Sequence, residues 1–426
     1  MSLESFYEDC GCADHEHEVI TLAAAGDDTP ELPEWINNFL KAIHAGDVLP
    51  GQIDPDYYGK VSKELLAGAA EGLGGSTFGA ADFKNTLKAF LDQNIYSFSS
   101  ARSLYMLEQY RSFLTDAQGN ILSEAQFISK VADVAFIDNI TYLKTERNSA
   151  MAMAQMAEKW EGLQAFPALE YRTVEDFRVR PEHAVLDRLI LATEDPFWNT
   201  IYPPNGWNCR CIVVPAAGDA ELSPKQDAYD KIKAANVQPY FKRNVGKEKM
   251  VYSNDHPYIE KVGVKKLNEL DAEKNYGLRS GEKIYDQDDL PGFKPVQDKA
   301  TANAWWQDMA GSARGSFDLK SVDDLAVTFD NEFRNHVLEG NKEDRFRIIK
   351  QLKDVLQNPD EVWSNRLRDT LQNTYIKYYE SGPVILAVEA EKKVRAISMY
   401  EIKHGDNINF DSLKKKRKGI LKYRTR

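Results

Sequence analysis

The strongest constraint on the fold of this chain is a change of sequence pattern close to Ala165. From Leu32 to about Leu163, apolar residues recur every three or four positions, which is the period of an amphipathic helix. Breaks rich in Gly, Pro and Asp divide this stretch into separate helical segments. The predicted helices cover residues 32–45, 58–70, 80–93, 97–114, 124–155 and 156–163.

The next stretch, up to Pro215, loses the helical period. Prolines and aromatic residues follow one another there, and a short β-like run closes it at residues 211–214. Pro203-Pro-Asn-Gly206 predicts a rigid turn, because proline fixes φ and glycine tolerates positive φ. Trp198 and Trp207 are expected to anchor a loop that has little regular structure. The pattern predicts an elongated helical layer followed by a loop-rich corner that contains Pro, Trp and Cys.

At 426 residues the chain exceeds the ~100–200 residues of a usual domain. A mixed, polar connector follows the corner, and a new pattern begins at Thr301. Two predicted helices, at 301–313 and 344–356, precede candidate strands at 375–379, 384–389, 394–402 and 420–423. We therefore predict a multidomain α+β fold whose second part combines helices with a small antiparallel sheet. The predicted division is a tail at 1–30, a mainly helical domain at 31–217, a connector at 218–300 and an α+β domain at 301–426.

The composition, with 42% hydrophobic residues, is that of an ordinary globular protein. The longest apolar runs fall short of the ~20 residues that a membrane-spanning helix needs, so we expect no membrane span. The acidic N-terminal segment lacks the pattern of a secretory signal, which makes folding in a cytoplasm the expectation. A net charge of −12 argues against a protein that coats nucleic acid along its whole surface.

The last segment departs from this acidic average. From Lys414 to Arg426 there are eight Lys or Arg residues and no acidic residue. Such a run attracts polyanions when it is exposed, although it is also the composition of a solvated terminus.

The four cysteines form two Cys-x-Cys pairs, namely Cys10 with Cys12 and Cys209 with Cys211. Four are too few for a disulfide scaffold in a chain of this length. Together they satisfy the four ligands of a tetrahedral structural zinc site, with His183, His15 or His17 as substitutes. One intervening residue is a tighter spacing than the usual two to four, so unliganded thiols and a disulfide remain alternatives. Zinc is the one cofactor that the sequence indicates, and no cofactor is required.

The stretches Tyr171–Asp187, Asp195–Trp198 and Tyr202–Cys211 resemble the signature block of Mu F-like head morphogenesis proteins of tailed phages. The resemblance rests above all on Arg180-Pro-Glu-His183 and Asn208-Cys-Arg-Cys211. With the helix upstream of the block it covers about residues 83–215.

This sequence departs from the family pattern at two positions, with Tyr171 where the family often has Trp and Arg188 where Gly is common. Neither departure touches the two motif cores. The resemblance implies a minor capsid protein that acts in procapsid assembly with portal, capsid and scaffold proteins. It also implies a location in the bacterial host cytoplasm during assembly and then in the head of the virion. Taken alone, the residues of this block fit either a loop region that is held together by its own side chains or a surface that contacts a partner.

Four segments of the last third resemble the phage-associated nuclease domains grouped with barnase, EndoU, colicin and RelE toxins. These segments are Asn358–Trp363, Tyr375–Tyr379, Ile397–Glu401 and Arg417–Tyr423. The resemblance spans about residues 322–426 and implies a toxin-like, metal-independent ribonuclease with RNA as substrate and an immunity protein as partner. A non-catalytic module that binds DNA or docks on the portal through the basic segment is the alternative. We find no Arg…Ser-Thr-Ser…Glu-x-Glu series that would indicate an ADP-ribosyltransferase.

Metal-free RNA cleavage needs a base for the 2′-hydroxyl proton, an acid for the leaving oxygen and cations for the phosphate. The catalytic candidates are His336, Lys377 and Arg417. The candidates for binding phosphate or RNA are Arg345, Ser398, Tyr400, Lys418 and Tyr423. Each type also has a structural alternative, since histidines and lysines are common on surfaces and tyrosines are common at the edge of a core.

Overall fold

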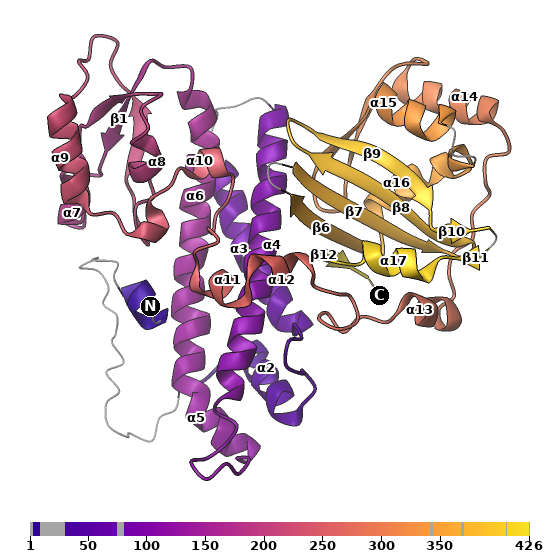
Figure 1. Cartoon of the computed structure of the whole chain (residues 1–426), viewed down its shortest axis with the longest axis horizontal. Helices are drawn as coiled ribbons and strands as arrows, with labels where there is room; N and C mark the ends of the chain where they lie inside the picture. Colours follow the sequence, from indigo (N-terminus) through magenta and orange to yellow (C-terminus); the bar gives the residue numbers. More distant parts are fainter. Residues whose placement is uncertain are drawn as a thin grey trace. The chain divides into compact units, whose positions relative to one another are not determined.

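The computed structural model describes residues 3–8, 30–74, 81–340, 344–367, 370–405 and 407–425 (Figure 1). The chain divides into two units. Unit 1 consists of Met1–Pro50, Asp54–Gly79 and Ala101–Lys261, and unit 2 consists of Gly51–Ile53, Ala80–Ser100 and Val262–Arg426. The predicted connector is thus divided between the units, with its residues up to Lys261 in unit 1.

Helices form most of unit 1, as the apolar period predicted. They are α1 (Leu3–Glu8), α2 (Glu34–Ala45), α3 (Pro55–Gly74), α5 (Glu124–Phe136), α6 (Leu143–Leu163) and the last part of α4 (Ala81–Arg111). The predicted break between residues 93 and 97 is wrong, because α4 is one continuous helix of 31 residues. It contains neither Gly nor Pro, so no residue in it stops a helix.

Helix α3 lies unusually close to α6 because of two glycines one turn apart. A Cβ atom on Gly68 would lie 2.6 Å from the carbonyl oxygen of Arg147, and one on Gly72 would lie 2.1 Å from that of Met151. Both distances are shorter than non-bonded atoms allow, so the two positions must be glycine for the helices to pack as they do.

A buried polar cluster occupies the centre of unit 1. Arg102 of α4 is fully buried and pairs with Glu146 of α6, with 3.1 Å between Nε and Oε2. It also donates to Tyr57 of α3 and, at 3.0 Å, to the Asn139 side chain. Asn139 and Asp138 lie on a π-helical turn, η1 (Ile137–Tyr142), which joins α5 to α6. A π turn inserts one residue, and here it turns two polar side chains into the interior.

The loop-rich corner contains a small antiparallel sheet in the order β2-β1-β3. The strands are β1 (Ala168–Arg172), β2 (Ile190–Ala192) and β3 (Ile212–Pro215). The sequence predicted β3 alone, because β1 and β2 have only five and three residues and no clear alternation. The short helices of this part are α7 (Pro181–Ala184), α8 (Trp198–Ile201), α9 (Lys225–Ala235), η2 (Pro239–Phe241), α10 (Val245–Glu248) and α11 (Pro257–Val262).

Unit 2 is built on a seven-stranded sheet in the order β12-β6-β7-β8-β9-β5-β4. The strands are β4 (Phe317–Lys320), β5 (Ala326–Phe329), β6 (Glu361–Leu367), β7 (Thr370–Tyr379), β8 (Gly382–Ala390), β9 (Val394–Glu401) and β12 (Ile420–Arg424). The four predicted strands correspond to β7, β8, β9 and β12. The sheet is mainly antiparallel, as predicted, but larger: β4, β5 and β6 were not predicted, and β5 runs parallel to β9.

Helices cover both faces of this sheet, with α16 and α17 on opposite sides (Figure 1). The helices of unit 2 are α12 (Val264–Asn268), α13 (Gly281–Gln287), α14 (Lys299–Ala310), α15 (Asn331–Arg334), η3 (Asn335–Glu339), η4 (Arg345–Gln351), α16 (Leu352–Gln357) and α17 (Phe410–Lys416). Two short strands, β10 (Lys403–His404) and β11 (Asn407–Ile408), form a separate antiparallel pair. Trp306 of α14 and Leu386 of β8 are both buried in the main hydrophobic core.

The first part of α4 belongs to the core of unit 2. Ala89 and Phe90 are buried in the same cluster as the sheet residues. The Asn85 side chain pairs with both backbone groups of Ala326, donating to its oxygen at 2.7 Å and accepting from its nitrogen at 2.9 Å. The guanidinium of Arg366 lies 4.9 Å from the centre of the Phe90 ring.

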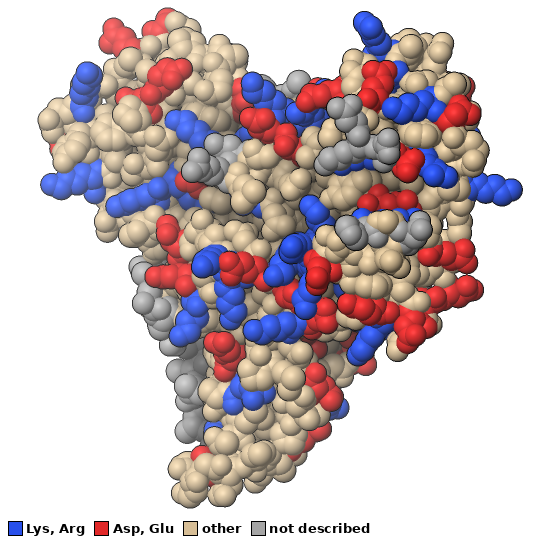
Figure 2. Space-filling model, turned by 45° about the vertical axis from the view of Figure 1, so that its right-hand side comes forward, with Lys and Arg blue, Asp and Glu red and all other residues tan. Residues whose placement is uncertain are grey.

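The surface carries charges of both signs. On the face drawn in Figure 2, Lys and Arg side chains are interspersed with Asp and Glu side chains. The net charge of −12 is therefore not gathered into one acidic region on that face. Within the described ranges, no helix combines the length and the apolar character that crossing a bilayer requires.

We expect Phe90→Ala to destabilise unit 2, although Phe90 is distant in sequence from the sheet. The substitution removes a fully buried ring, which typically lowers the free energy of unfolding by about 3–5 kcal/mol. Hydrogen exchange of the β8 amides in the full chain measures the effect. Asp82→Ala, an exposed position on the same helix, is the control and should leave the exchange unchanged. Equal protection of β8 in both variants would contradict the packing described above.

We also expect Asp138 to make the stability of unit 1 depend on pH. Burial raises the pKa of this carboxyl group from 3.8 to about 7. Because the pKa is raised in the folded state, the stabilisation that the neutral acid provides is present at low pH and is lost as the pH rises through about 7. Relative to Asp138→Asn, the free energy of unfolding of the wild type should fall by up to about 4 kcal/mol between about pH 4 and pH 7.

Denaturant unfolding of the full chain at several pH values measures this difference. Asp133→Asn, an exposed change in the preceding helix α5, is the matched control and should follow the wild-type curve. Parallel pH curves for the wild type and Asp138→Asn would show that the Asp138 carboxyl is not held neutral by burial.

Candidate functional site

One end of β9 forms an open strand edge in unit 2. Strand β5 pairs with β9 at a single described position, Thr328 with Arg395, and no ladder on that side of β9 includes its later residues. A β-bulge follows, because Ala396 pairs with Val388 whereas Ser398 pairs with the adjacent Ala387. Bulges redirect side chains and commonly lie beside functional sites. Beyond this bulge, Ser398 and Tyr400 are two residues apart and therefore share one face of the strand.

Two segments that follow β5 bring further polar side chains to this edge. His336 lies on the π-helical turn η3, whose neighbours Val337 and Leu338 are buried in the core. Arg345 is the first residue of η4. The apolar residues of η3 thus fix the backbone, and the exposed imidazole of His336 is directed toward β9.

Three of the predicted residues contact one another through this imidazole. The Nε2 atom of His336 lies 3.2 Å from Oγ of Ser398 and within hydrogen-bond distance of Nη1 of Arg345. Arg345 Nη1 also donates to Ser398 Oγ at 3.3 Å. A guanidinium has no acceptor atom, so this contact is a hydrogen bond only when Nε2 is the unprotonated nitrogen of the imidazole. In that form His336 can act as a base.

Two cations flank the fourth predicted residue, Tyr400. The guanidinium carbon of Arg345 lies 5.4 Å from the centre of the Tyr400 ring, and Nζ of Lys416 lies 6.0 Å from it. Partial burial lowers the pKa of Arg345 from its ordinary value, but a guanidinium stays protonated in proteins. The edge therefore combines a base, hydroxyl groups and two positive charges, which are the groups that recognise a phosphodiester.

The other two catalytic candidates lie elsewhere in unit 2. Arg417 is buried and makes two hydrogen bonds to the carboxylate of Glu361, at 2.7 and 2.9 Å. That ion pair raises the pKa of Arg417 above its ordinary value, although burial alone would lower it. Lys377 is half-buried on β7, where its Nζ donates to the backbone oxygen of Asn358 at 2.6 Å. Neither residue contacts His336 in any described interaction.

The remaining RNA-binding candidates also lie outside the His336 cluster. Lys418 is exposed, and its backbone oxygen accepts a hydrogen bond from the Asn365 side chain at 3.0 Å. Tyr423 on β12 is half-buried and packs against the hydrophobic core of unit 2. The sequence did not single out Lys416 within its basic segment. The signal that could have found Lys416 is its position in the last turn of the short helix α17. A residue on a helix has a fixed side-chain direction, whereas a residue in an unstructured terminus has none.

The basic segment is partly folded into the domain. Besides the buried Arg417, Lys422 pairs with Asp323 at 2.5 Å, and its charged group is buried. Lys414 lies 3.8 Å from Glu273. At least two of the eight basic residues of this segment thus form buried ion pairs in unit 2. Exposed residues such as Lys416 and Lys418 remain accessible to a polyanion.

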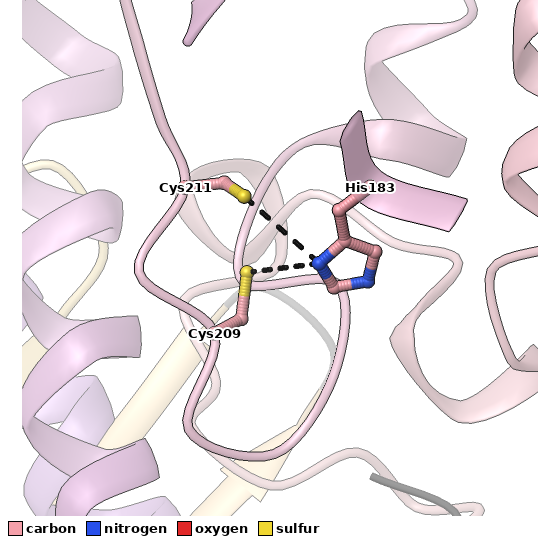
Figure 3. A group of neighbouring side chains, drawn as sticks. All are labelled: His183, Cys209 and Cys211. Carbon is pink, nitrogen blue, oxygen red and sulfur yellow. Dashed lines mark hydrogen bonds between the residues drawn. The ribbon is translucent and has the colours of Figure 1, made fainter. Parts of the chain in front are cut away.

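The two motif cores of the corner meet in unit 1 around three side chains (Figure 3). His183 lies on α7, and Cys209 and Cys211 lie on the loop that leads into β3. The Nδ1 atom of His183 is 3.7 Å from Sγ of Cys209 and 3.9 Å from Sγ of Cys211. All three side chains are buried, and both cysteines are free thiols.

Arg180 organises the backbone around these side chains. Its guanidinium donates to the backbone oxygen of Trp207 at 2.5 Å. It passes so close to Gly206 that a Cβ atom there would lie 2.6 Å from Nη1 of Arg180. The motif arginine and the motif glycine are therefore required together. A hydrogen bond from Cys211 holds the pKa of the Cys209 thiol well below its ordinary value, and the same pairing raises the pKa of Cys211.

The other half of the predicted zinc site lies outside the described residues. Cys10, Cys12, His15 and His17 belong to the segment 9–29. Coordination by all four cysteines therefore stays a prediction. Among the described residues, the structure brings His183 together with the cysteine pair that follows it in the sequence.

Comparison with known proteins finds a match in each part of the chain. Residues 123–214 match the family described as Phage Mu protein F like protein, and residues 307–424 match the family described as phage-Barnase-EndoU-ColicinE5/D-RelE like nuclease2. No solved structure matches the chain.

Two curated relatives align with parts of the chain. A protein of Escherichia phage Mu named "Putative capsid assembly protein F" is 34% identical over 103 residues, which are 24% of this chain and 22% of that protein. The "Mu-like prophage FluMu F protein" of Haemophilus influenzae is 40% identical over 73 residues, which are 17% of this chain and 18% of that protein. The chain thus spans about a fifth of the length of each relative. As its motifs predicted, the chain contains a segment that matches the Phage Mu protein F like family and a C-terminal segment that matches the phage nuclease family.

Proposed function

We propose that this chain is a minor head assembly protein of a tailed phage or prophage, and that its unit 2 cleaves RNA without a metal ion. The observation that carries the second part is the cluster of the exposed His336 with the half-buried Arg345, Ser398 and Tyr400. These residues come from three separate segments and meet inside the range that matches the nuclease family. The head role rests on the Mu F-like segment and on the capsid assembly name of its phage Mu relative.

In the proposed reaction, the 2′ oxygen of a ribose attacks the adjacent phosphorus atom. His336 takes the 2′-hydroxyl proton on Nε2 once bound substrate has drawn the Arg345 guanidinium from this nitrogen to the phosphate. The bond between phosphorus and O2′ forms while the bond to O5′ breaks. The Tyr400 hydroxyl donates a proton to the leaving 5′ oxygen. His336 then loses its proton to solvent and Tyr400 regains one, which leaves a 2′,3′-cyclic phosphate and a 5′-hydroxyl end.

Charge stabilisation in this reaction falls to the cations. Arg345 contacts the imidazole and Ser398, so its fork of donors reaches the place where negative charge develops on the phosphate oxygens. Arg345 and Lys416 near the Tyr400 ring also stabilise the charge that forms on the phenol oxygen during proton donation. Ser398 contacts the imidazole when no substrate is bound, and its hydroxyl donates to a phosphate oxygen instead once substrate occupies the cluster.

The partners in this proposal follow from the two parts of the chain. The Mu F-like segment acts with portal, capsid and scaffold proteins in the cytoplasm of the bacterial host, and the chain then remains in the head of the virion. The substrate of unit 2 is RNA. An immunity protein made by the producing cell covers the exposed His336 cluster until the chain leaves that cell.

Cleavage of single-stranded RNA by the full chain tests the nuclease proposal. We expect activity in excess chelator, with 2′,3′-cyclic phosphate products and no cleavage of an RNA whose 2′-hydroxyls are replaced by hydrogen. His336→Ala and Arg345→Ala should each lower kcat/KM by about 10²–10⁴-fold, the usual contribution of an acid–base or charge-stabilising group. Tyr400→Phe keeps the ring that both cations approach and should lower kcat rather than raise KM.

Lys350→Ala is the matched control, because Lys350 is an exposed cation on the same short helix as Arg345. It should retain wild-type activity. A folded full chain that cleaves no RNA, or one whose activity survives His336→Ala, would overturn the proposal. Retention of DNA or portal binding in such an inactive chain would instead support the non-catalytic alternative.

A second prediction separates Arg417 from the catalytic cluster. Arg417→Ala leaves the buried carboxylate of Glu361 without its partner, which typically costs about 3–5 kcal/mol. We therefore expect loss of stability of unit 2 in thermal unfolding, whereas Arg345→Ala should lose activity with an unchanged unfolding curve. An Arg417→Ala variant that is inactive yet as stable as the wild type would return Arg417 to the catalytic candidates.

A further inference from the structure

We propose that His183, Cys209 and Cys211 bind one zinc ion that holds the corner of unit 1 together. The inference concerns the Mu F-like segment and does not depend on the nuclease proposal. It also differs from the sequence-based prediction in its ligands, because the described residues supply one histidine and one Cys-x-Cys pair.

The first argument is the spacing of the three donor atoms. Zinc bonds are about 2.3 Å long to sulfur and about 2.1 Å to nitrogen, and the ligands are arranged tetrahedrally. Donors of these two kinds on one ion therefore lie about 3.6 Å from each other. The structure has 3.7 and 3.9 Å between Nδ1 of His183 and the two sulfur atoms, and all three donors lie within 4.8 Å of one another. These distances fit one ion among the three atoms with little movement.

The second argument is the direction and burial of the side chains. In Figure 3 both sulfur atoms point toward the same ring nitrogen, although the cysteines are separated by Arg210. The side chain of Arg210 points away and pairs with Asp176 at 2.7 Å on the exposed side. His183 is 4% exposed and the cysteines are 8% and 6% exposed, so the three donors are shielded from bulk water. Thiolate and imidazole donors together select zinc over magnesium or calcium.

The third argument is that the backbone places the donors before any ion binds. Pro181 starts α7 at its first turn, which fixes the direction of His183 two residues later. The backbone nitrogen of Cys209 donates to the oxygen of Gly206 at 3.2 Å, and Asn208 within this turn has φ of 53°. Arg180 holds the same turn through Trp207. Ligands that are preorganised in this way lose little conformational entropy when the ion binds.

The ion would stabilise a part of unit 1 that has little regular structure. It links α7, which follows β1, to the loop before β3, and so connects the two motif cores across 26 residues of sequence. Binding requires that both thiols release their protons, while His183 coordinates as a neutral ring. A tetrahedral ion has a fourth position, which water or a further donor fills.

Metal analysis of the purified full chain under reducing conditions tests the proposal. We expect about one zinc per chain in the wild type and less than a tenth of that in Cys209→Ser and His183→Ala. Arg210→Ala is the matched control, because it changes the residue between the two cysteines and leaves all three ligands in place. It should keep its zinc.

Cobalt(II) titration of the zinc-free wild type gives a second readout that does not depend on any variant folding. Two thiolate ligands should produce a strong sulfur-to-cobalt charge-transfer band at one equivalent, and zinc should abolish it by competition. A wild-type chain that contains no zinc and shows no such band would overturn the proposal. Zinc retained at full stoichiometry in a Cys209→Ser, Cys211→Ser double variant would overturn it equally.

Discussion

Arg102 carries a positive charge into the fully buried centre of unit 1, and the packing of that unit depends on how this charge is neutralised. Its partners come from α3, the π turn η1 and α6, so four separate helical segments are fixed by one guanidinium. Removing one member of a buried ion pair typically costs about 3–5 kcal/mol, because the other charge is left in an apolar environment. A shift of any of these helices by one turn would have the same effect. The ion pair therefore selects one register among the many that apolar packing alone would allow.

The same cluster also accounts for the position of the N-terminal helix. Tyr7 of α1 donates to Glu146 at 2.7 Å, and its ring stacks on Trp207 with centroids 4.9 Å apart. Trp207 in turn donates through Nε1 to the backbone oxygen of Phe6 at 3.0 Å. The buried charge and the motif corner are thus joined through one short helix within unit 1.

Local sequence patterns predicted the helices and strands of this structure better than they predicted which of these elements pack together. Apolar periodicity predicts the helices of unit 1 and four strands of unit 2. It can do so because the period of a helix and the alternation of a strand both depend on residues that are close in sequence. It does not predict that Phe90, in the first helical stretch, enters the core of a sheet more than 200 residues later. Strand β6 was missed because Asn365 and Arg366 interrupt its alternation of polar and apolar residues.

The candidate sites show the same limit. Residue chemistry singled out His336, Arg345, Ser398 and Tyr400, and the structure brings these four together. Chemistry alone also selected Arg417, whose role depends on Glu361, a residue 56 positions away. In the corner, the motif residues His183, Cys209 and Cys211 were all recognised as possible ligands. The sequence could not show which of several Cys and His combinations converge, because convergence is set by the turn at Gly206 and by Arg180.

Helix α4 has a consequence for any replacement of the C-terminal domain by another. Its residues 81–100 belong to unit 2 and its residues 101–111 to unit 1, without a Gly or Pro between them. The boundary between the two units therefore does not coincide with a single crossover point in the gene. A recombination event that replaced the segment after residue 262 would retain Asn85 and Phe90, which are shaped for the sheet that had been lost. A replacement that leaves both units folded is expected to include this half-helix as well, or to bring in a domain whose sheet accepts the same helix.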